Sequence, residues 1–151
     1  MSGAKPHRGY WATVFGCYCP RCREGKLFER PLSFRLKGTM KMHEHCPVCG
    51  QITDIEVGFY YGTGYVSYFI GIFLSVATLL LWWLVIGFSF HDNRFLYWVV
   101  FNSVLLGFLQ PFLMRFSRAL WLSWFVRYDP DWRQHPLEHN ERINRDQMGN
   151  W

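Results

Sequence analysis

The longest uncharged stretch of the sequence restricts the possible folds more than any other feature. Residues 57–90 contain no Asp, Glu, Lys or Arg. The core helix of a soluble protein is not free of charge over such a length, whereas a helix needs only about 20 apolar residues to cross a bilayer. We therefore expect an integral membrane protein with its first transmembrane helix at residues 65–88, in which small residues allow close helix packing: Ser67, Gly71 and Ser75.

A second apolar run predicts a second transmembrane helix at residues 95–114. The loop between the two helices, residues 89–94, is so short that they must be antiparallel neighbours. The predicted fold is therefore a membrane α-helical hairpin with both termini on one side. Arginines beyond the second span outnumber the single Arg94 of the loop, and the positive-inside rule then places both termini in the cytoplasm; these arginines are Arg115, Arg118 and Arg127.

The segment after the second span has two readings. Pro111 should kink or end the helix. The following residues mix arginines with apolar residues, which predicts a basic interfacial helix at 115–128 with its arginines toward lipid phosphates. The alternative is a long, tilted second helix whose arginines snorkel. Residues 129–151 form a polar tail.

Cysteine spacing predicts a metal centre near the N-terminus. Four of the five cysteines form two CxxC pairs, each with Pro after the first cysteine: Cys19, Cys22, Cys46 and Cys49. No signal peptide is expected in the lead at residues 1–16, so metal thiolates in a reducing compartment are favoured over disulfides. Two CxxC turns brought together form a closed tetrahedral site, which favours structural zinc; iron in a rubredoxin-like site is the alternative.

Residues 17–56 are expected to form a small β zinc ribbon, followed by a Gly/Tyr connector at 57–64. So small a domain has almost no core, so the metal should contribute much of its folding free energy. Other potential ligands are expected to lie outside the site: Cys17 as a buried small residue, and His43 and His45 as surface residues. In the tail, His135 and His139 have the spacing of one helical turn and predict at most a weak, adventitious metal site.

Polar residues within the spans point to packing rather than transport. The spans contain no histidine that could bind a bilayer haem and no charged residues that would mark an ion path. Asn102 and Gln110 are expected to form hydrogen bonds between helices, and Ser103 and Gly107 to allow close packing, with the other arm, a second copy or a different protein. Aromatic residues near the span ends are expected to anchor at the interfaces: Tyr65, Tyr68, Trp82, Trp83, Tyr97, Trp98, Trp121 and Trp124.

The sequence contains no arrangement of nucleophile or paired acid and base, so we expect no catalytic residues, no enzymatic activity and no small-molecule substrate. The net charge of +5 is compatible with nucleic acid or anionic lipid. In a membrane protein the basic residues of the ribbon are better explained by lipid. The expected partners are therefore the bilayer and a second membrane protein or copy, without nucleic acid.

The order of these features resembles that of a bacterial family, domain of unknown function 983, in its Bacteroidetes-like version. The first motif is CPRCREGKLF at residues 19–28 and the second is CPVCG at 46–50, followed by two spans and a basic segment. Arg23 departs from the glycine usual in the family's first knuckle, which predicts a looser turn there.

The family has no assigned activity, but some members are encoded beside cytochrome oxidase genes. The resemblance therefore implies a non-enzymatic accessory or assembly subunit that docks to a larger, respiratory complex in the bacterial inner (cytoplasmic) membrane. The alternative function is that of a rubredoxin-like, iron-containing electron-transfer membrane protein.

Overall fold

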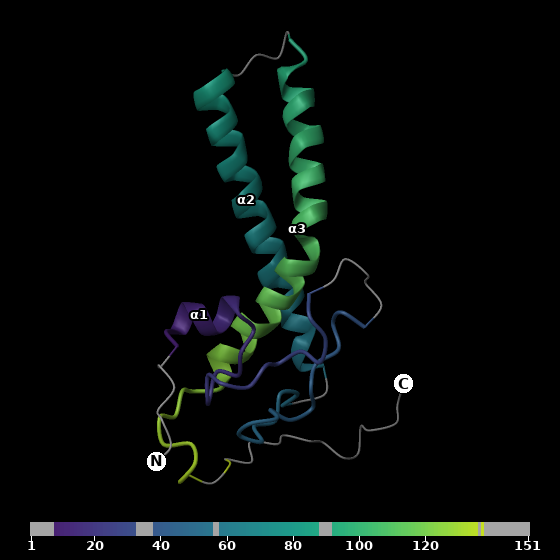
Figure 1. Ribbon diagram of the computed structural model, residues 1–151. Helices are drawn as coiled ribbons and strands as arrows, with labels where there is room; N and C mark the ends of the chain where they lie inside the picture. The colour runs from purple at the N-terminus through teal and green to yellow at the C-terminus, as the bar shows by residue number, and fades with distance from the viewer. Residues whose placement is uncertain (1–7, 33–37, 56–57, 88–91, 136, 138–151) are drawn as a thin grey trace.

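Two long helices dominate the structure, a computed structural model that describes residues 8–32, 38–55, 58–87, 92–135 and 137. In chain order the elements are α1 (Tyr10–Phe15), the short 3₁₀ helix η1 (Phe59–Tyr61), α2 (Gly62–Ile86) and α3 (Arg94–Phe125). In Figure 1, α2 and α3 run alongside each other, and α1 and the cysteine-bearing coil lie around the end that is remote from their connection.

Both long helices have the length and apolar composition required to cross a membrane. These stretches are Phe59–Ile86 and Arg94–Phe125. The most apolar part of the first contains no buried residue, whereas a core helix of a soluble protein would be mostly buried. An apolar surface of this extent suggests insertion into lipid.

Polar side chains join α2 to α3 inside the predicted spans. Asn102 on α3 donates from Nδ2 to Oγ of Ser75 at 3.1 Å, and its Oδ1 accepts from Oγ1 of Thr78 at 3.1 Å. This confirms the predicted inter-helix role of Asn102. Gln110, for which the same role was predicted, is instead exposed on α3. A Cβ added at Gly71 would meet no atom within 4 Å, so that glycine is not required for packing between α2 and α3.

Helix α3 does not end near Pro111, and the predicted boundary between a span at 95–114 and a separate helix at 115–128 is wrong. One helix runs from Arg94 to Phe125 with Pro111 inside it, as in the alternative reading. Proline removes one donor from the helical ladder, but the turns beyond it are held by packing, since Phe116, Ala119 and Leu122 are all buried.

The C-terminal half of α3 is the platform on which the cysteine-bearing segment packs. Its buried side chains share one core cluster with residues of α1 and of the coil between the cysteines: Val14, Cys19, Cys22, Leu27, Phe28, Cys46, Phe116, Ala119, Leu122 and Val126. The start of α2 also approaches α3 closely, because a Cβ at Gly62 would lie 2.4 Å from the ring of Trp121. The core of the protein therefore lies at one end of the helical pair.

The strands expected of a β ribbon are not confirmed. Within the described part of residues 17–56 there are only three isolated bridges, Tyr18 with Lys26, Phe28 with Met42, and His45 with Ile52. Neighbouring residues Leu27 and Phe28 are both buried, which breaks the alternation of a strand. Residues 33–37 of the predicted ribbon lie outside the described residues. We call residues 17–55 the cysteine module.

Candidate metal centre

Each CxxC pair forms a turn of the same backbone design. The N–H of Arg23 donates to the carbonyl of Cys19 at 2.8 Å, and the N–H of Gly50 donates to the carbonyl of Cys46 at 2.9 Å. In both turns the residue after the second cysteine is left-handed, with φ of 57° at Arg23 and 72° at Gly50. The two halves of the centre therefore repeat each other, as expected for two knuckles that share one ion.

A backbone hydrogen bond closes the base of each knuckle. Cys19 N–H donates to the carbonyl of Gly25 at 2.7 Å, and Cys46 N–H donates to that of Gln51 at 2.8 Å. The first knuckle is thus one residue longer than the second. Because the donors of these two hydrogen bonds are the N–H groups of Cys19 and Cys46 themselves, the bonds restrict the directions in which the sulfurs of these two residues project.

All four predicted ligand residues are brought together. Their sulfur atoms lie within 4.8 Å of one another, with 3.7 Å between Sγ of Cys19 and Cys49 and 3.8 Å between Sγ of Cys22 and Cys46. Tetrahedral coordination with metal–sulfur bonds of about 2.3 Å separates sulfurs by about 3.8 Å. The Cys19–Cys49 and Cys22–Cys46 distances match this separation, and the four side chains could bind a metal ion.

Gly25 completes the centre and was not singled out as a functional residue from the sequence. A Cβ at this position would lie 2.3 Å from Sγ of Cys46. Its N–H also donates to Sγ of Cys22 at 3.5 Å, a contact that favours thiolate over thiol. The only sequence signal was a glycine three residues after the first CxxC pair, within the motif that carries the family resemblance.

The four thiols strongly affect one another's ionisation. Hydrogen bonds from Cys19, Cys46 and Cys49 lower the pKa of Cys22 far below its usual range, whereas hydrogen bonding with Cys22, Cys46 and Cys49 raises the pKa of Cys19. Like charges this close cannot all ionise without compensation. A divalent cation at the centre of the group would supply that compensation and hold all four as thiolates.

Arg23 occupies a backbone conformation that normally favours glycine. Its side chain donates to the carbonyl of Arg8 at 2.8 Å, and Arg8 donates back to the carbonyl of Arg23 at 2.9 Å. The guanidinium of Arg23 also lies 3.9 Å from the ring centroid of Tyr128. The turn is formed although this position is not glycine, because these contacts offset the cost of a left-handed non-glycine residue.

Two arginines of α3 attach the cysteine module to the helix. Arg115 is buried and donates from Nη2 to the carbonyls of Arg30 at 2.9 Å and Pro31 at 3.1 Å, and from Nε to the carbonyl of Thr39 at 2.9 Å. Arg118 donates to the carbonyl of Met40 at 2.9 Å. The predicted orientation toward lipid phosphates is therefore wrong for Arg115 and Arg118, because both side chains donate to backbone carbonyls of the module. Arg127, the third arginine of that prediction, is exposed.

A second attachment links the first knuckle to the segment after α3. The buried Arg21 forms an ion pair with Asp129 at 3.7 Å and donates to the carbonyl of His135 at 3.1 Å. The Asp129 carboxylate in turn contacts Nδ1 of His135 at 3.0 Å. His135 therefore has a partner, and the predicted pairing with His139 lies outside the described residues.

The other potential ligands do not join the group of four. Cys17 is half-buried with a φ of 53°, and burial raises its pKa to about 11, with the Arg115 cation opposing that effect. His43 is half-buried and His45 is exposed. These positions agree with the prediction that the three lie outside the metal centre, although Cys17 is less buried than expected.

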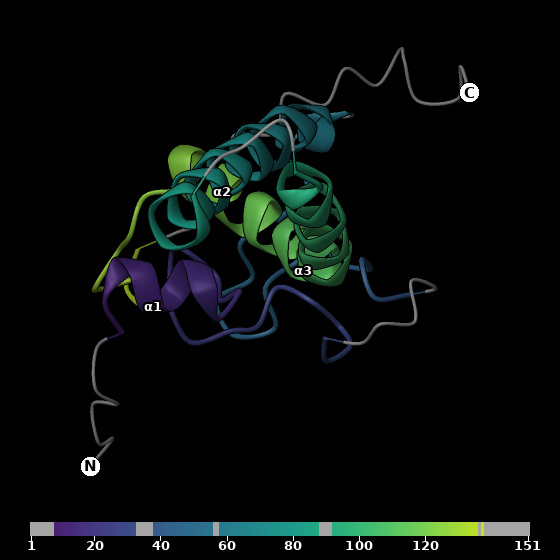
Figure 2. The same ribbon diagram turned by 90° about the horizontal axis from the view of Figure 1, so that it is seen from above.

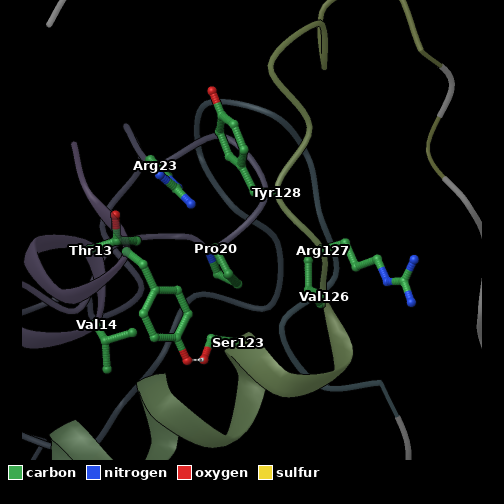
Figure 3. Close-up of a pocket in the computed structure, with 9 residues that line it drawn as sticks. Thr13, Val14, Pro20, Arg23, Ser123, Val126, Arg127 and Tyr128 are labelled. Atoms are coloured by element: carbon green, nitrogen blue, oxygen red, sulfur yellow. Dashed lines mark hydrogen bonds between the residues drawn. The ribbon is translucent and has the colours of Figure 1, made fainter. Parts of the chain in front are cut away.

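A small cavity lies between α1, the first knuckle and the end of α3 (Figure 3). It has a volume of about 100 Å³, below the roughly 300 Å³ at which small-molecule sites begin. Its wall includes Pro20 and Arg23 of the knuckle, and the hydroxyls of Tyr10 and Ser123 pair beside it at 2.9 Å. Its lining residues therefore connect α1 to α3 as well as to the knuckle.

Comparisons with protein-family models, with curated proteins and with solved structures found no match to this chain.

Proposed function

We propose that this chain is a non-enzymatic integral membrane protein whose cysteine module holds structural zinc, and that it serves as an accessory or assembly subunit of a larger membrane complex. The observation that carries the metal assignment is the convergence of the sulfurs of Cys19, Cys22, Cys46 and Cys49 within 4.8 Å of one another. Four thiolates fill every position of a tetrahedral zinc ion, which favours a structural role over a catalytic one.

A structural metal is favoured because the cysteines themselves form part of the module's core. Three of the four cysteines are buried and are part of its core. Metal bound at such a site contributes folding free energy directly. Their role as metal ligands would also explain why four thiols lie so close together in a small core.

Metal analysis of the full-length protein, purified at native expression level, tests this assignment. We expect about one zinc per chain, lost when any of the four cysteines is changed to serine and retained in Cys17→Ser. Iron with reversible visible absorbance would overturn zinc and establish the electron-transfer alternative, because an S4 site also accepts iron.

The proposed location is the bacterial inner membrane, with the hairpin spanning it and both termini in the cytoplasm. Asp92 and Arg94 at the connection form a charged pair at 3.6 Å and lie at the end remote from the module. Labelling of Asn93→Cys in intact spheroplasts by a membrane-impermeant maleimide should succeed without lysis. Labelling that requires lysis would overturn this topology.

A docking role is supported by the way the module is mounted. Arg115 and Arg118 join the module to α3, so a partner protein could contact the hairpin and the module at the same time. Affinity purification from the native membrane, followed by mass spectrometry, should recover a defined membrane complex; the sequence resemblance is the support for a respiratory one. Recovery of a solitary monomer would overturn the docking role. Neither nucleic acid nor a small-molecule substrate is part of the proposal.

A further inference from the structure

Helix α1 carries an exposed aromatic surface that the metal centre does not use. Trp11 and Phe15 lie one helical turn apart and are 62% and 52% exposed, whereas Thr13 and Val14 on the opposite side are buried. Large aromatic side chains on one side of a surface helix indicate contact with something apolar.

The position of α1 in the fold identifies that contact. Phe15 stacks on Phe116 with ring centroids 4.8 Å apart and on Phe112 at 6.5 Å. Figure 1 shows α1 lying across the direction of the hairpin, and Figure 2, which looks down on the hairpin from above, shows α1 along its length. If the hairpin crosses a bilayer, α1 therefore runs parallel to the membrane plane.

The depth of α1 can be measured along the long helices. At about 1.5 Å per residue, Phe112 and Phe116 lie roughly 27 and 33 Å along α3 from Arg94 at its start. These values bracket the hydrocarbon thickness of about 30 Å. On α2 the exposed Tyr65 lies about 32 Å from Ile86 and so reaches the same level. Helix α1 thus sits where the hydrocarbon meets the lipid headgroups, at the end remote from the connection.

We propose that α1 lies in the membrane interface, with Trp11 and Phe15 inserted at the boundary between headgroups and acyl chains. Tryptophan favours this zone because its ring is apolar while its N–H remains in contact with polar groups. The interfacial segment predicted at 115–128 is thereby replaced by residues 10–15. This inference rests on the proposed membrane insertion of the hairpin.

An interfacial α1 also fixes the height of the metal centre. The chain passes from α1 into the first knuckle within a few residues, and two hydrogen bonds hold that passage: Cys17 N–H to the carbonyl of Val14 at 3.1 Å, and Tyr18 N–H to that of Thr13 at 2.9 Å. Insertion of α1 therefore holds the first knuckle close to the lipid surface.

The test uses the full-length protein, labelled with 5-fluorotryptophan and reconstituted in phosphatidylcholine vesicles. The fluorine resonance of Trp11 is assigned by its loss in Trp11→Phe, which keeps an aromatic ring. Two paramagnetic probes are compared, a lipid with a nitroxide just below its headgroup and a water-soluble gadolinium chelate. Trp83, 57% exposed on α2, serves as the reference for membrane insertion, and Trp132, after α3, as the reference outside the spans.

We expect the lipid nitroxide to broaden the Trp11 resonance and the chelate to leave it sharp. Broadening by the chelate alone, with Trp83 still protected, would place α1 in water and overturn the inference while leaving the hairpin in the membrane. Protection from both probes would show that protein covers α1 and would equally overturn it. If the chelate also broadened the Trp83 resonance, the hairpin would not be inserted in the membrane. That result would overturn the proposed insertion and, with it, this inference.

Discussion

Arg115 of α3 donates from Nε to the carbonyl oxygen of Thr39 at 2.9 Å, so that a residue of a candidate membrane helix holds a loop of the cysteine module directly. The same guanidinium reaches the carbonyls of Arg30 and Pro31, and it lies over the ring of Phe28 at 4.6 Å. One planar side chain thus joins several points of the module to the helix, which a flexible ammonium group could not do.

Changing Arg115 to lysine should loosen the module while keeping the charge. Hydrogen bonds to charged groups stabilise by about 1.5–3 kcal/mol. Hydrogen–deuterium exchange at Lys41 and His43, whose N–H groups bond to Gly38 and Leu27, should accelerate roughly ten- to hundredfold. Arg127→Lys is the matched control, since Arg127 is exposed. Equal exchange in both variants would contradict an attachment through Arg115.

Changing Gly25 to alanine should weaken metal binding, because the added Cβ would lie 2.3 Å from Sγ of Cys46. Changes in groups that support metal ligands typically cost ten- to a hundredfold in affinity, and we expect a loss of about that size in competition with a chromogenic chelator. Gly9→Ala adds the same methyl group where no atom lies within 4 Å and should leave the affinity unchanged. An unaltered affinity in Gly25→Ala would argue against the sulfur positions described above.

Alkylation of Cys17 in the metal-loaded protein should report its raised pKa of about 11. A raised pKa means that the protonated thiol predominates at neutral pH, and only about one molecule in a thousand carries the reactive thiolate at pH 8. The rate with iodoacetamide, followed by mass spectrometry, should rise about tenfold per pH unit toward pH 11. A rate that levels off near pH 9 would contradict this environment, and Cys17→Ser should remain unmodified throughout.

The bond between Asn102 and Ser75 should stabilise the pairing of α2 with α3. A double-mutant cycle with Asn102→Ala and Ser75→Ala should give a coupling free energy of about 0.6 kcal/mol, the average for such pairs in membrane proteins. Unfolding measured by steric trapping in bicelles is a suitable readout. Ser103→Ala is the control, because its hydroxyl bonds to Val99 within the same helix, and pairing it with Asn102→Ala should show no coupling.

The sequence was sufficient to predict features that depend on local pattern. The two long apolar helices follow from composition, and the cluster of four cysteines follows from CxxC spacing, since each pair makes its own turn. The inter-helix bond of Asn102 was also predictable, because an amide inside an apolar span needs a partner.

Features that depend on contacts between distant residues were not predictable. Pro111 suggested the end of a helix, yet α3 continues because Phe116 and Leu122 pack on the module. The partners of Arg115 lie 76 to 85 residues away, and nothing near Arg115 in the sequence indicates them. The ribbon strands were not confirmed, since Leu27 and Phe28 are both buried and so do not alternate as in a strand.

Because α3 is one uninterrupted helix, the number of residues along it determines the direction in which the metal centre lies about the helix axis. One extra residue between the stretch that packs on α2 and the stretch that carries the module would turn the module by about 100° and shift it by about 1.5 Å. Four extra residues would bring the direction back to within about 40° while moving the centre by about 6 Å. A partner protein that contacted both the hairpin and the module would therefore lose affinity when the module is rotated relative to the hairpin, even if every contact residue were unchanged.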